Sequence, residues 1–237
     1  MLLNDSNNMI TCNFKIKIIS NKNNYNENYA LKYLERRIKT YTVDKENFQN
    51  LFKKYNINIS NETVLDLASG VGMDLKILSE FKPKTLIWHD KMEGVYKIAK
   101  NNLKDIKNIT FNIKDLLELD GYSTNTIKFI ICRESLYYIN NDFYFFKEIK
   151  RILKPNGFFW GRNVNINWYK QKSPEIQTIK KIRGLYFDWP LYKLTGLRFF
   201  AFTPVDSKRL KYIFKKLNFL IEYFKEEENY LEFLIKK

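Results

Sequence analysis

The sequence is poor in the residues that build metal centres and disulfide frameworks. Its 237 residues include 2 cysteines, Cys12 and Cys132, and a single histidine, His89. Two cysteines are too few for a disulfide framework or a cysteine-rich zinc site. One histidine excludes a site built from several histidine ligands. We therefore expect no bound metal.

Long apolar runs are also missing. No stretch approaches the roughly 18 apolar residues that span a bilayer, and the first 13 residues lack the apolar segment of a secretion signal. We therefore expect a cytoplasmic protein without a membrane span. Apolar residues make up 45% of the chain and aromatic residues 16%, which is ample for a large core and excludes global disorder.

Short apolar runs alternate with helical patterns from residue 60 onwards. The runs expected to form strands lie at about 63–68, 85–88, 109–113, 127–132 and 157–160. This alternation is typical of a Rossmann-like, doubly wound α/β fold with a mostly parallel sheet. After an expected helix at 207–216, two more strands are expected at 219–224 and 230–235. Because a short turn joins these two, we predict a seven-stranded sheet that ends in an antiparallel pair.

The first 59 residues precede this pattern and are expected to form an arm and two capping helices. Helical spacing begins at Glu27, and a second helix is expected at 44–55 with Asp44 as its N-cap. Residues 60–237 are expected to form the main domain. Whether the two helices cap a pocket or pack on the edge of the sheet stays open.

A glycine loop is the sharpest local feature. In the segment VLDLASGVGMD at 64–74, an expected strand leads through Gly70 and Gly72 into an expected helix. Glycines at this place let the backbone turn tightly and approach a ligand closely. The sequence contains neither the G-x-G-x-x-G fingerprint nor the G-x-x-x-x-G-K-[ST] loop of phosphate-binding sites.

Carboxylates follow the neighbouring strands. Asp90 ends the second expected strand, where it can accept both hydrogen bonds of a ribose diol, or act as a helix N-cap. Asp115 follows the third, where it can accept a hydrogen bond from an exocyclic amine while Leu116 lies against a base. Together with Asp66, these residues predict a nucleoside site at the carboxyl edge of the sheet.

The glycine loop at 65–72, Asp90, the pair Asp115 and Leu116, residues 130–136 and residues 151–157 follow one another along the chain as five motifs. With these five motifs, the chain resembles the class I S-adenosylmethionine-dependent methyltransferases of the small-molecule type. Residues 65–72 look like the first motif of that family, with Ala68 in place of one glycine. Residues 130–136 are similar to its fourth strand and active-site loop, and residues 151–157 to the turn before its fifth strand. The resemblance covers about residues 60–162 and implies S-adenosylmethionine as the cofactor.

The resemblance also implies which residues form the site. Glu134 is the candidate base, Arg133 the candidate clamp for an anionic substrate, and Tyr137 a wall of the pocket, although each also has a plain structural interpretation. Strand alternation predicts that His89 points away from the cofactor if Asp90 faces it. The residues expected to bind the cofactor are Asp66, Ala68, Ser69, Gly70, Gly72, Asp90, Lys91, Met92, Asp115, Leu116, Cys132 and Arg133.

The net charge of +15 is unevenly distributed. Residues 61–155 carry 15 basic and 13 acidic side chains, whereas residues 162–216 carry 13 basic and 3 acidic ones, including half of the 8 arginines. Arginine is the better clamp for phosphate or carboxylate. We therefore expect residues 162–204 to form a lid over a small anionic acceptor.

The expected acceptor is a phosphorylated or acidic sugar, a nucleotide-linked sugar or a phosphoramidate, methylated on oxygen or nitrogen. The alternative is an RNA methyltransferase that uses the basic C-terminal region as its electrostatic footprint. We expect no DNA partner, and either a monomer or a homodimer.

Overall fold

A computed structural model describes residues 27–139, 141–165, 205 and 207–237. The predicted N-terminal arm and residues 166–204 of the predicted lid lie outside these residues. In the part of the chain that is described, no helix combines the length and the apolar character needed to cross a membrane.

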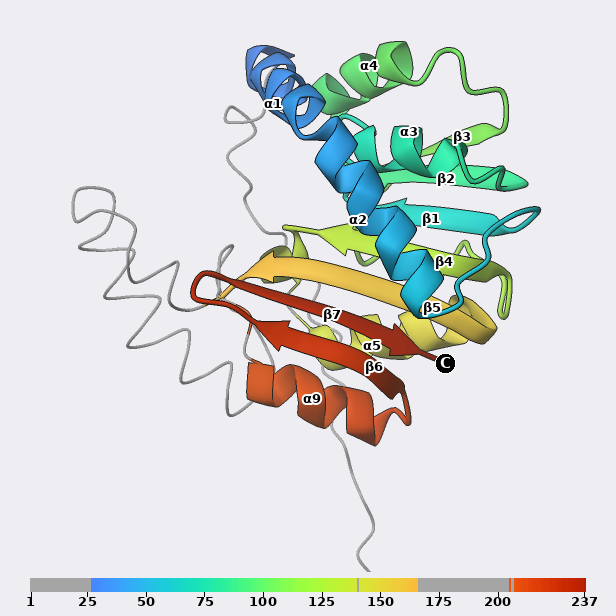
Figure 1. Cartoon of the computed structure of the whole chain (residues 1–237), viewed down its shortest axis with the longest axis vertical. Coiled ribbons are helices and arrows are strands. Elements are labelled where there is room, and N and C mark those ends of the chain that lie inside the picture. The colour runs from blue at the N-terminus through green and yellow to red at the C-terminus, as the bar shows by residue number, and fades with distance from the viewer. Residues whose placement is uncertain (1–26, 140, 166–204, 206) are drawn as a thin grey trace, which may run out of the picture.

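A seven-stranded sheet forms the centre of the described part (Figure 1). Its strand order is β3-β2-β1-β4-β5-β7-β6. The first five strands are parallel, and β7 pairs antiparallel with both β5 and β6. The predicted fold class is therefore confirmed. The strands are β1 (Thr63–Leu67), β2 (Thr85–Asp90), β3 (Ile109–Ile113), β4 (Ile127–Arg133), β5 (Leu153–Val164), β6 (Leu220–Glu226) and β7 (Tyr230–Lys236).

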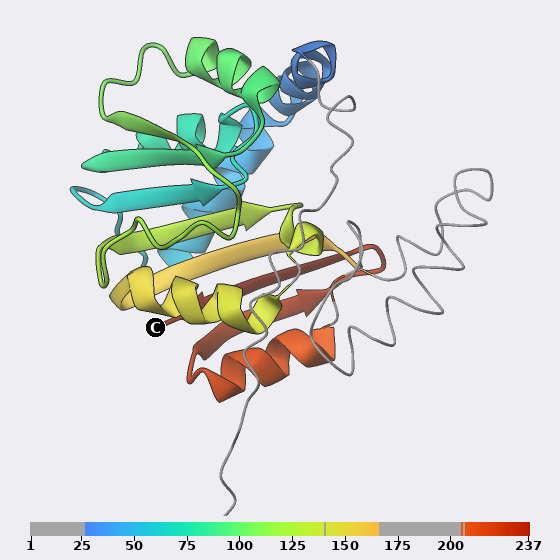
Figure 2. The ribbon, with the colours of Figure 1, turned by 180° about the vertical axis from the view of Figure 1, so that it is seen from behind.

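Helices cover both faces of the sheet. Helices α1 to α4 lie on the face towards the viewer in Figure 1, and α5 and α9 lie on the other face, which Figure 2 shows from behind. A short 3-10 helix, η1, follows β4. The helices are α1 (Glu27–Lys39), α2 (Tyr41–Lys54), α3 (Met73–Ser79), α4 (Glu93–Asn102), η1 (Leu136–Tyr138), α5 (Asp142–Ile152) and α9 (Ser207–Lys216).

Side-chain alternation along β4 divides the core into two layers. Phe129 and Ile131 are fully buried in the cluster under α2 and α3, whereas Ile130 and Cys132 are fully buried in the cluster under α5 and α9. A strand that is buried on both faces reads as a continuous apolar run, as expected for the middle of a parallel sheet. The same alternation directs Arg133, the last residue of β4, towards α2.

The start of α2 differs from the prediction. The helix begins at Tyr41 with Thr40 as its N-cap, so the assignment of Asp44 as N-cap is wrong. Asp44 lies within the first turn of the helix and is buried. Its carboxylate binds two arginine side chains instead. One of these partners, Arg133, is 89 positions away from Asp44, so a pattern read locally could not reveal this pairing.

Candidate active site

The glycine loop between β1 and α3 has the backbone conformation that its sequence implies. Gly70 and Gly72 have φ angles of 54° and 77°, in the left-handed region that glycine adopts without strain. A Cβ on Gly72 would lie 2.4 Å from the Cδ1 atom of Leu103, so this residue also allows close packing. Ala68, which stands in place of a family glycine, has a φ of 55°.

Asp90 fastens this loop to the end of β2. Its carboxylate accepts hydrogen bonds from the backbone N of Gly70 at 2.9 Å and of Met92 at 3.0 Å. Burial raises the pKa of Asp90, and the backbone hydrogen bonds oppose that rise. One side chain therefore joins two neighbouring strand ends at the carboxyl edge.

Asp115 extends the same edge beyond β3. Its carboxylate accepts a hydrogen bond from the Leu117 backbone N at 3.2 Å and one from the Lys91 Nζ at 2.9 Å. Leu116 is partly buried against the core. The structure thus brings Lys91, Asp115 and Leu116 to the edge where the sequence placed a nucleoside.

Asp66 lies beneath the loop, at the end of β1. Only 2% of the residue is exposed, and its carboxylate accepts a hydrogen bond from the Ser69 Oγ at 2.7 Å. Burial and the neighbouring charge of Asp74 raise the pKa of Asp66 well above its ordinary value. Asp66 and Ser69 therefore fix the inner side of the loop.

A cluster of four charged residues, Arg37, Asp44, Asp74 and Arg133, lies between α1, α2, α3 and the end of β4. We call it the buried ion cluster, because its side chains are at most 12% exposed. Arg133 binds Asp44 at 2.9 Å and Asp74 at 3.2 Å, and Arg37 binds the same two carboxylates at 3.2 Å and 2.8 Å. The two positive and two negative charges balance.

The ion pairs of this cluster decide the charge state of Asp44. Burial alone would raise the pKa of Asp44, but the hydrogen bonds and the charge of Arg133, with help from Arg37, lower it. Asp44 is therefore held as a carboxylate. Sequence reasoning missed Arg37, Asp44 and Asp74 as site residues, since 89 positions separate Asp44 from Arg133.

Helix α1 reaches the glycine loop through Tyr33. A Cβ built on Gly70 would lie 3.7 Å from the Cε1 atom of Tyr33, and Arg37 donates a hydrogen bond to the Tyr33 hydroxyl at 3.2 Å. Burial raises the pKa of Tyr33. The N-terminal helices therefore pack directly on the site, and Tyr33 is another residue that the sequence did not reveal.

The predicted catalytic residues lie on two faces of the sheet. Arg133 belongs to the buried ion cluster on the α2 face. Tyr137 packs against the core on the α5 face, with its ring 4.4 Å from that of Tyr138. Glu134 is half-buried, has a φ of 54° and donates a backbone hydrogen bond to the Arg162 carbonyl at 2.7 Å.

His89 and Cys132 both point away from the α2 face. The imidazole of His89 contacts the Tyr122 hydroxyl and the Asp115 carbonyl, each at 2.8 Å, and burial lowers its pKa. Cys132 is fully buried, and burial raises its pKa well above its ordinary value. The side chain of His89 therefore lies on the face of the sheet opposite α2, and its orientation relative to the cofactor stays a prediction.

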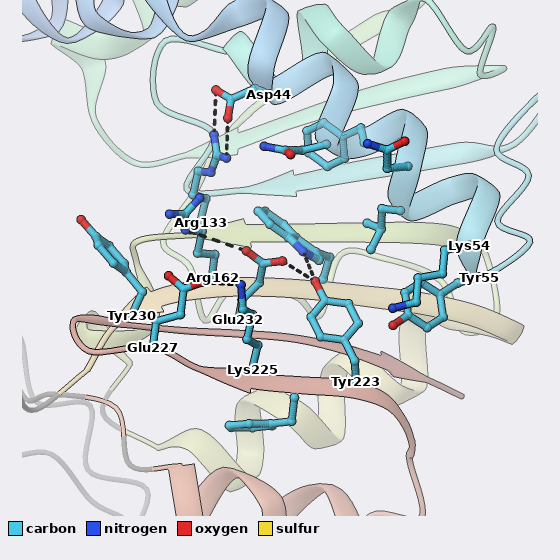
Figure 3. A pocket seen from close by; sticks show the side chains of 16 residues that line it. Asp44, Lys54, Tyr55, Arg133, Arg162, Tyr223, Lys225, Glu227, Tyr230 and Glu232 are labelled. Atoms are coloured by element: carbon cyan, nitrogen blue, oxygen red, sulfur yellow. Dashed lines mark hydrogen bonds and ion pairs between the residues drawn. The ribbon is translucent and has the colours of Figure 1, made fainter.

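A groove of about 580 Å³ lies between α2 and the strands β5, β7 and β6 (Figure 3). Arg133, at the end of β4, lies at the end of the groove that meets the buried ion cluster. Arg162 lies beside it on the neighbouring strand β5. Of the residues that form the groove, Arg133 was predicted as a site residue, Asp44 was predicted as a helix cap, and Arg162 lies in the basic segment at 162–216. Its remaining polar and aromatic lining includes Trp160, Tyr223, Tyr230 and Glu232.

The carboxyl edge fits a nucleoside-bearing cofactor. Two left-handed glycines open the backbone at the end of β1, while Asp90 and Asp115 stand at the next two strand ends. In doubly wound sheets, ligands bind at this edge, beside the point where the strand order reverses. The fold and the edge together define a Rossmann-like protein that binds a nucleoside cofactor.

Comparison with known proteins identifies the class. A family model described as a methyltransferase domain matches residues 58–216. The chain therefore belongs to this methyltransferase family, and it is an S-adenosylmethionine-dependent methyltransferase of class I. No curated protein matches the chain.

Solved structures show the same fold at low sequence identity. A candidate S-adenosylmethionine-dependent methyltransferase from Methanococcus maripaludis is 19% identical, with a TM-score of 0.62 over 92% of this chain and 96% of that one. A second such enzyme, from Mesorhizobium loti, is 15% identical, with a TM-score of 0.58 over 76% and 93%. Phosphoethanolamine N-methyltransferase 2 from Haemonchus contortus is 14% identical, with a TM-score of 0.58 over 80% and 52%.

Proposed function

We propose that the protein transfers a methyl group from S-adenosylmethionine to an oxygen or nitrogen atom of a small anionic acceptor. The observation that carries the cofactor half of this proposal is the hydrogen-bonded junction of Gly70, Asp90 and Met92. It holds a carboxylate at the edge where a ribose diol can bind. A cytoplasmic location and the division into residues 1–59 and 60–237 belong to the same proposal.

The predicted cofactor residues at the ends of β1, β2 and β3 have distinct tasks in this proposal. Asp90 accepts hydrogen bonds from the ribose hydroxyls, and Asp115 with Leu116 contacts the base. The backbone from Ala68 to Gly72 approaches the amino-acid part of the cofactor, with Asp66 beneath it. Bound there, the cofactor supplies an electrophilic methyl group on its sulfonium, so the remaining task of the protein is to orient the acceptor. Orientation of this kind contributes on the order of 7–11 kcal/mol in favourable cases.

The loop after β4 holds the candidate residues for the transfer itself. Where the substrate must lose a proton before it is methylated, Glu134 takes that proton. A phosphate, carboxylate or neutral amine substrate needs no such base. Arg133 keeps the end of β4 in place through Asp44 and Asp74. Tyr137 forms the wall on the opposite side of the loop.

Two observations support an anionic acceptor. Residues 162–216 carry 13 basic and only 3 acidic side chains, which favours a negatively charged ligand. Among the structural neighbours, the enzyme from Haemonchus contortus was solved in complex with phosphomonomethylethanolamine, a small molecule that carries a phosphate.

The cofactor site is tested by Asp90→Ala. Loss of a charged hydrogen bond costs about 1.5–3 kcal/mol, so we expect the affinity for S-adenosylmethionine to fall at least tenfold in calorimetry. The exposed Asp105→Ala variant is the control, and thermal unfolding of both variants separates lost binding from lost folding. Unchanged affinity in a folded Asp90→Ala protein would contradict the ribose assignment.

The acceptor class is tested with a methyl-labelled cofactor. Phosphorylated, carboxylated and neutral small molecules and bulk tRNA are offered in parallel, and we expect label only in the acidic small molecules. Methyl transfer to neutral apolar acceptors alone would contradict the proposed anionic acceptor. Transfer to tRNA that weakens steeply with salt would instead establish the RNA alternative.

A further inference from the structure

Arg162 is a half-buried arginine whose side chain has open hydrogen-bonding capacity. It lies opposite Arg133 in the register of β4 and β5, and its guanidinium lies 5.0 Å from the centre of the Tyr230 ring. The nearest carboxylate oxygen, on Glu232, is 3.9 Å from the Arg162 Nε. Among the described residues, no group accepts a hydrogen bond from the Arg162 side chain. Figure 3 shows Arg162 and Glu232 pointing towards each other within the groove.

Two other cations of the groove, Arg133 and Lys225, are more closely paired, whereas Lys54 lies over the ring of Tyr55. Arg133 is bound by Asp44 and Asp74 in the buried ion cluster, and Lys225 is bound by Glu227. The hydroxyl of Tyr223 donates a hydrogen bond to Glu232 at 2.5 Å, which fixes this carboxylate from the side of β6. A guanidinium with open donors can bind an acid group of a ligand. The four cations that line the groove (Lys54, Arg133, Arg162 and Lys225) also outnumber its three carboxylates (Asp44, Glu227 and Glu232).

The walls of the groove are aromatic. The ring of Tyr223 stacks on Tyr55 at 5.4 Å with an angle of 26° between the planes, and its hydroxyl accepts a hydrogen bond from the Trp160 Nε1 at 2.8 Å. Together with Tyr230 under Arg162, these rings present flat apolar surfaces on both sides of the charge. The volume of about 580 Å³ lies within the range typical of small-molecule sites.

We infer that this groove is the acceptor site, and that Arg162 binds the carboxylate or phosphate of an acceptor whose body is flat and aromatic. This inference rests on the proposed function, since it assumes an anionic acceptor. The groove reaches the cofactor edge at Arg133, which contacts both the groove and Asp74 at the start of α3. An acceptor held by Arg162 therefore lies one strand away from the end of β4.

The test is calorimetric binding of phenyl phosphate, inorganic phosphate and phenol to the full chain in the presence of S-adenosylmethionine. We expect phenyl phosphate to bind more tightly than either of its parts. The Arg162→Gln variant is expected to bind it at least tenfold more weakly, and Arg162→Lys to fall in between, because lysine lacks the planar fork of arginine. Cofactor affinity is expected to stay unchanged in both variants.

Arg36→Gln is the matched control. Arg36 is exposed and also lies over a tyrosine ring, with its Cζ 5.6 Å from the centre of Tyr33, but it does not line the groove. We expect this variant to bind phenyl phosphate like the wild type. Equal binding by wild type and Arg162→Gln, or binding of phenol as tight as that of phenyl phosphate, would overturn the inference.

Methyl transfer separates this inference from the proposed function. If Arg162→Gln methylates an acidic acceptor as fast as the wild type does, with an unchanged KM, the assignment of Arg162 is wrong while the proposed function stands. If binding of phenyl phosphate depends on Arg162 but no acidic compound is methylated, the groove binds acids and the proposed acceptor class is wrong.

Discussion

Arg133 and Arg162 occupy matching positions on neighbouring strands, but their surroundings differ. Arg133 is 11% exposed and contacts two carboxylates within hydrogen-bonding distance. Arg162 is 31% exposed, and its one carboxylate contact is 3.9 Å long within the described residues. The first arginine is committed to holding α2 and α3 against the end of β4. The guanidinium of Arg162 still has N–H donors that can bind a ligand.

The largest expected effect comes from removing each arginine in turn. Arg133→Gln leaves Asp44 and Asp74 with Arg37 as their remaining partner, and loss of one member of a buried pair costs about 3–5 kcal/mol. Arg162→Gln removes an ion contact at the surface and is expected to cost less than about 1 kcal/mol. Urea unfolding measures both. Similar losses in the two variants would remove the contrast between the arginines.

The next effect concerns pH and the buried ion cluster. The pKa of Asp44 is lowered in the folded protein, so this carboxylate contributes stability that is fully present above its ordinary pKa. That stability is lost as the pH falls through the lower, folded pKa. We expect the difference in unfolding free energy between wild type and Asp44→Asn to be largest near neutral pH and to shrink in acid.

Asp105→Asn provides the reference for this titration, because Asp105 is an exposed aspartate. Unfolding of the wild type and both variants is followed by urea titration from about pH 7 to about pH 3, a window that includes the ordinary carboxylate pKa. A difference between wild type and Asp44→Asn that grows as the pH falls would show that Asp44 is not held as a carboxylate by Arg133.

The smallest effect concerns the ring beneath Arg162. Tyr230→Leu removes a cation–π contact, which contributes about 0.5–1 kcal/mol at an exposed site. We expect phenyl phosphate to bind two- to fivefold more weakly, with little change in stability. Tyr144→Leu is the control, since Tyr144 is 49% exposed and lies on α5 at the opposite face of the sheet. An equal loss in both variants would show that Tyr230 does not orient Arg162.

Local patterns were sufficient to predict most of the fold. The helix at 207–216 was predicted with the bounds that the structure has, because Leu210, Ile213 and Phe214 form a continuous buried stripe. Alternation along β2 gave opposite directions for His89 and Asp90. The start of β5 was placed at Gly157, four residues later than the observed Leu153. In that stretch Pro155 and Asn156 are residues that usually disfavour strands, so the sequence pattern did not predict one there.

The contacts of α1 and α2 could not be predicted in this way. Leu31 and Ile38 belong to a helical stripe in the sequence, yet they are 44% and 57% exposed. The residues that fasten α1 to the site are Tyr33 and Arg37, whose partners lie on α3 and in the glycine loop. Their pairing depends on the tertiary arrangement, which sequence periodicity does not encode.

The strand order also determines when each strand can pair during synthesis of the chain. Within the described sheet, β6 pairs only with β7, and β7 follows it in the chain. The chain emerges from the ribosome N-terminus first. The parallel strands β1 to β5 can therefore pair before β7, the partner of β6, has been synthesised. Unpaired strands expose hydrogen-bonding edges that favour aggregation. When Tyr230–Lys236 pairs with β5 and β6, it covers the free edge of β5 and one edge of β6.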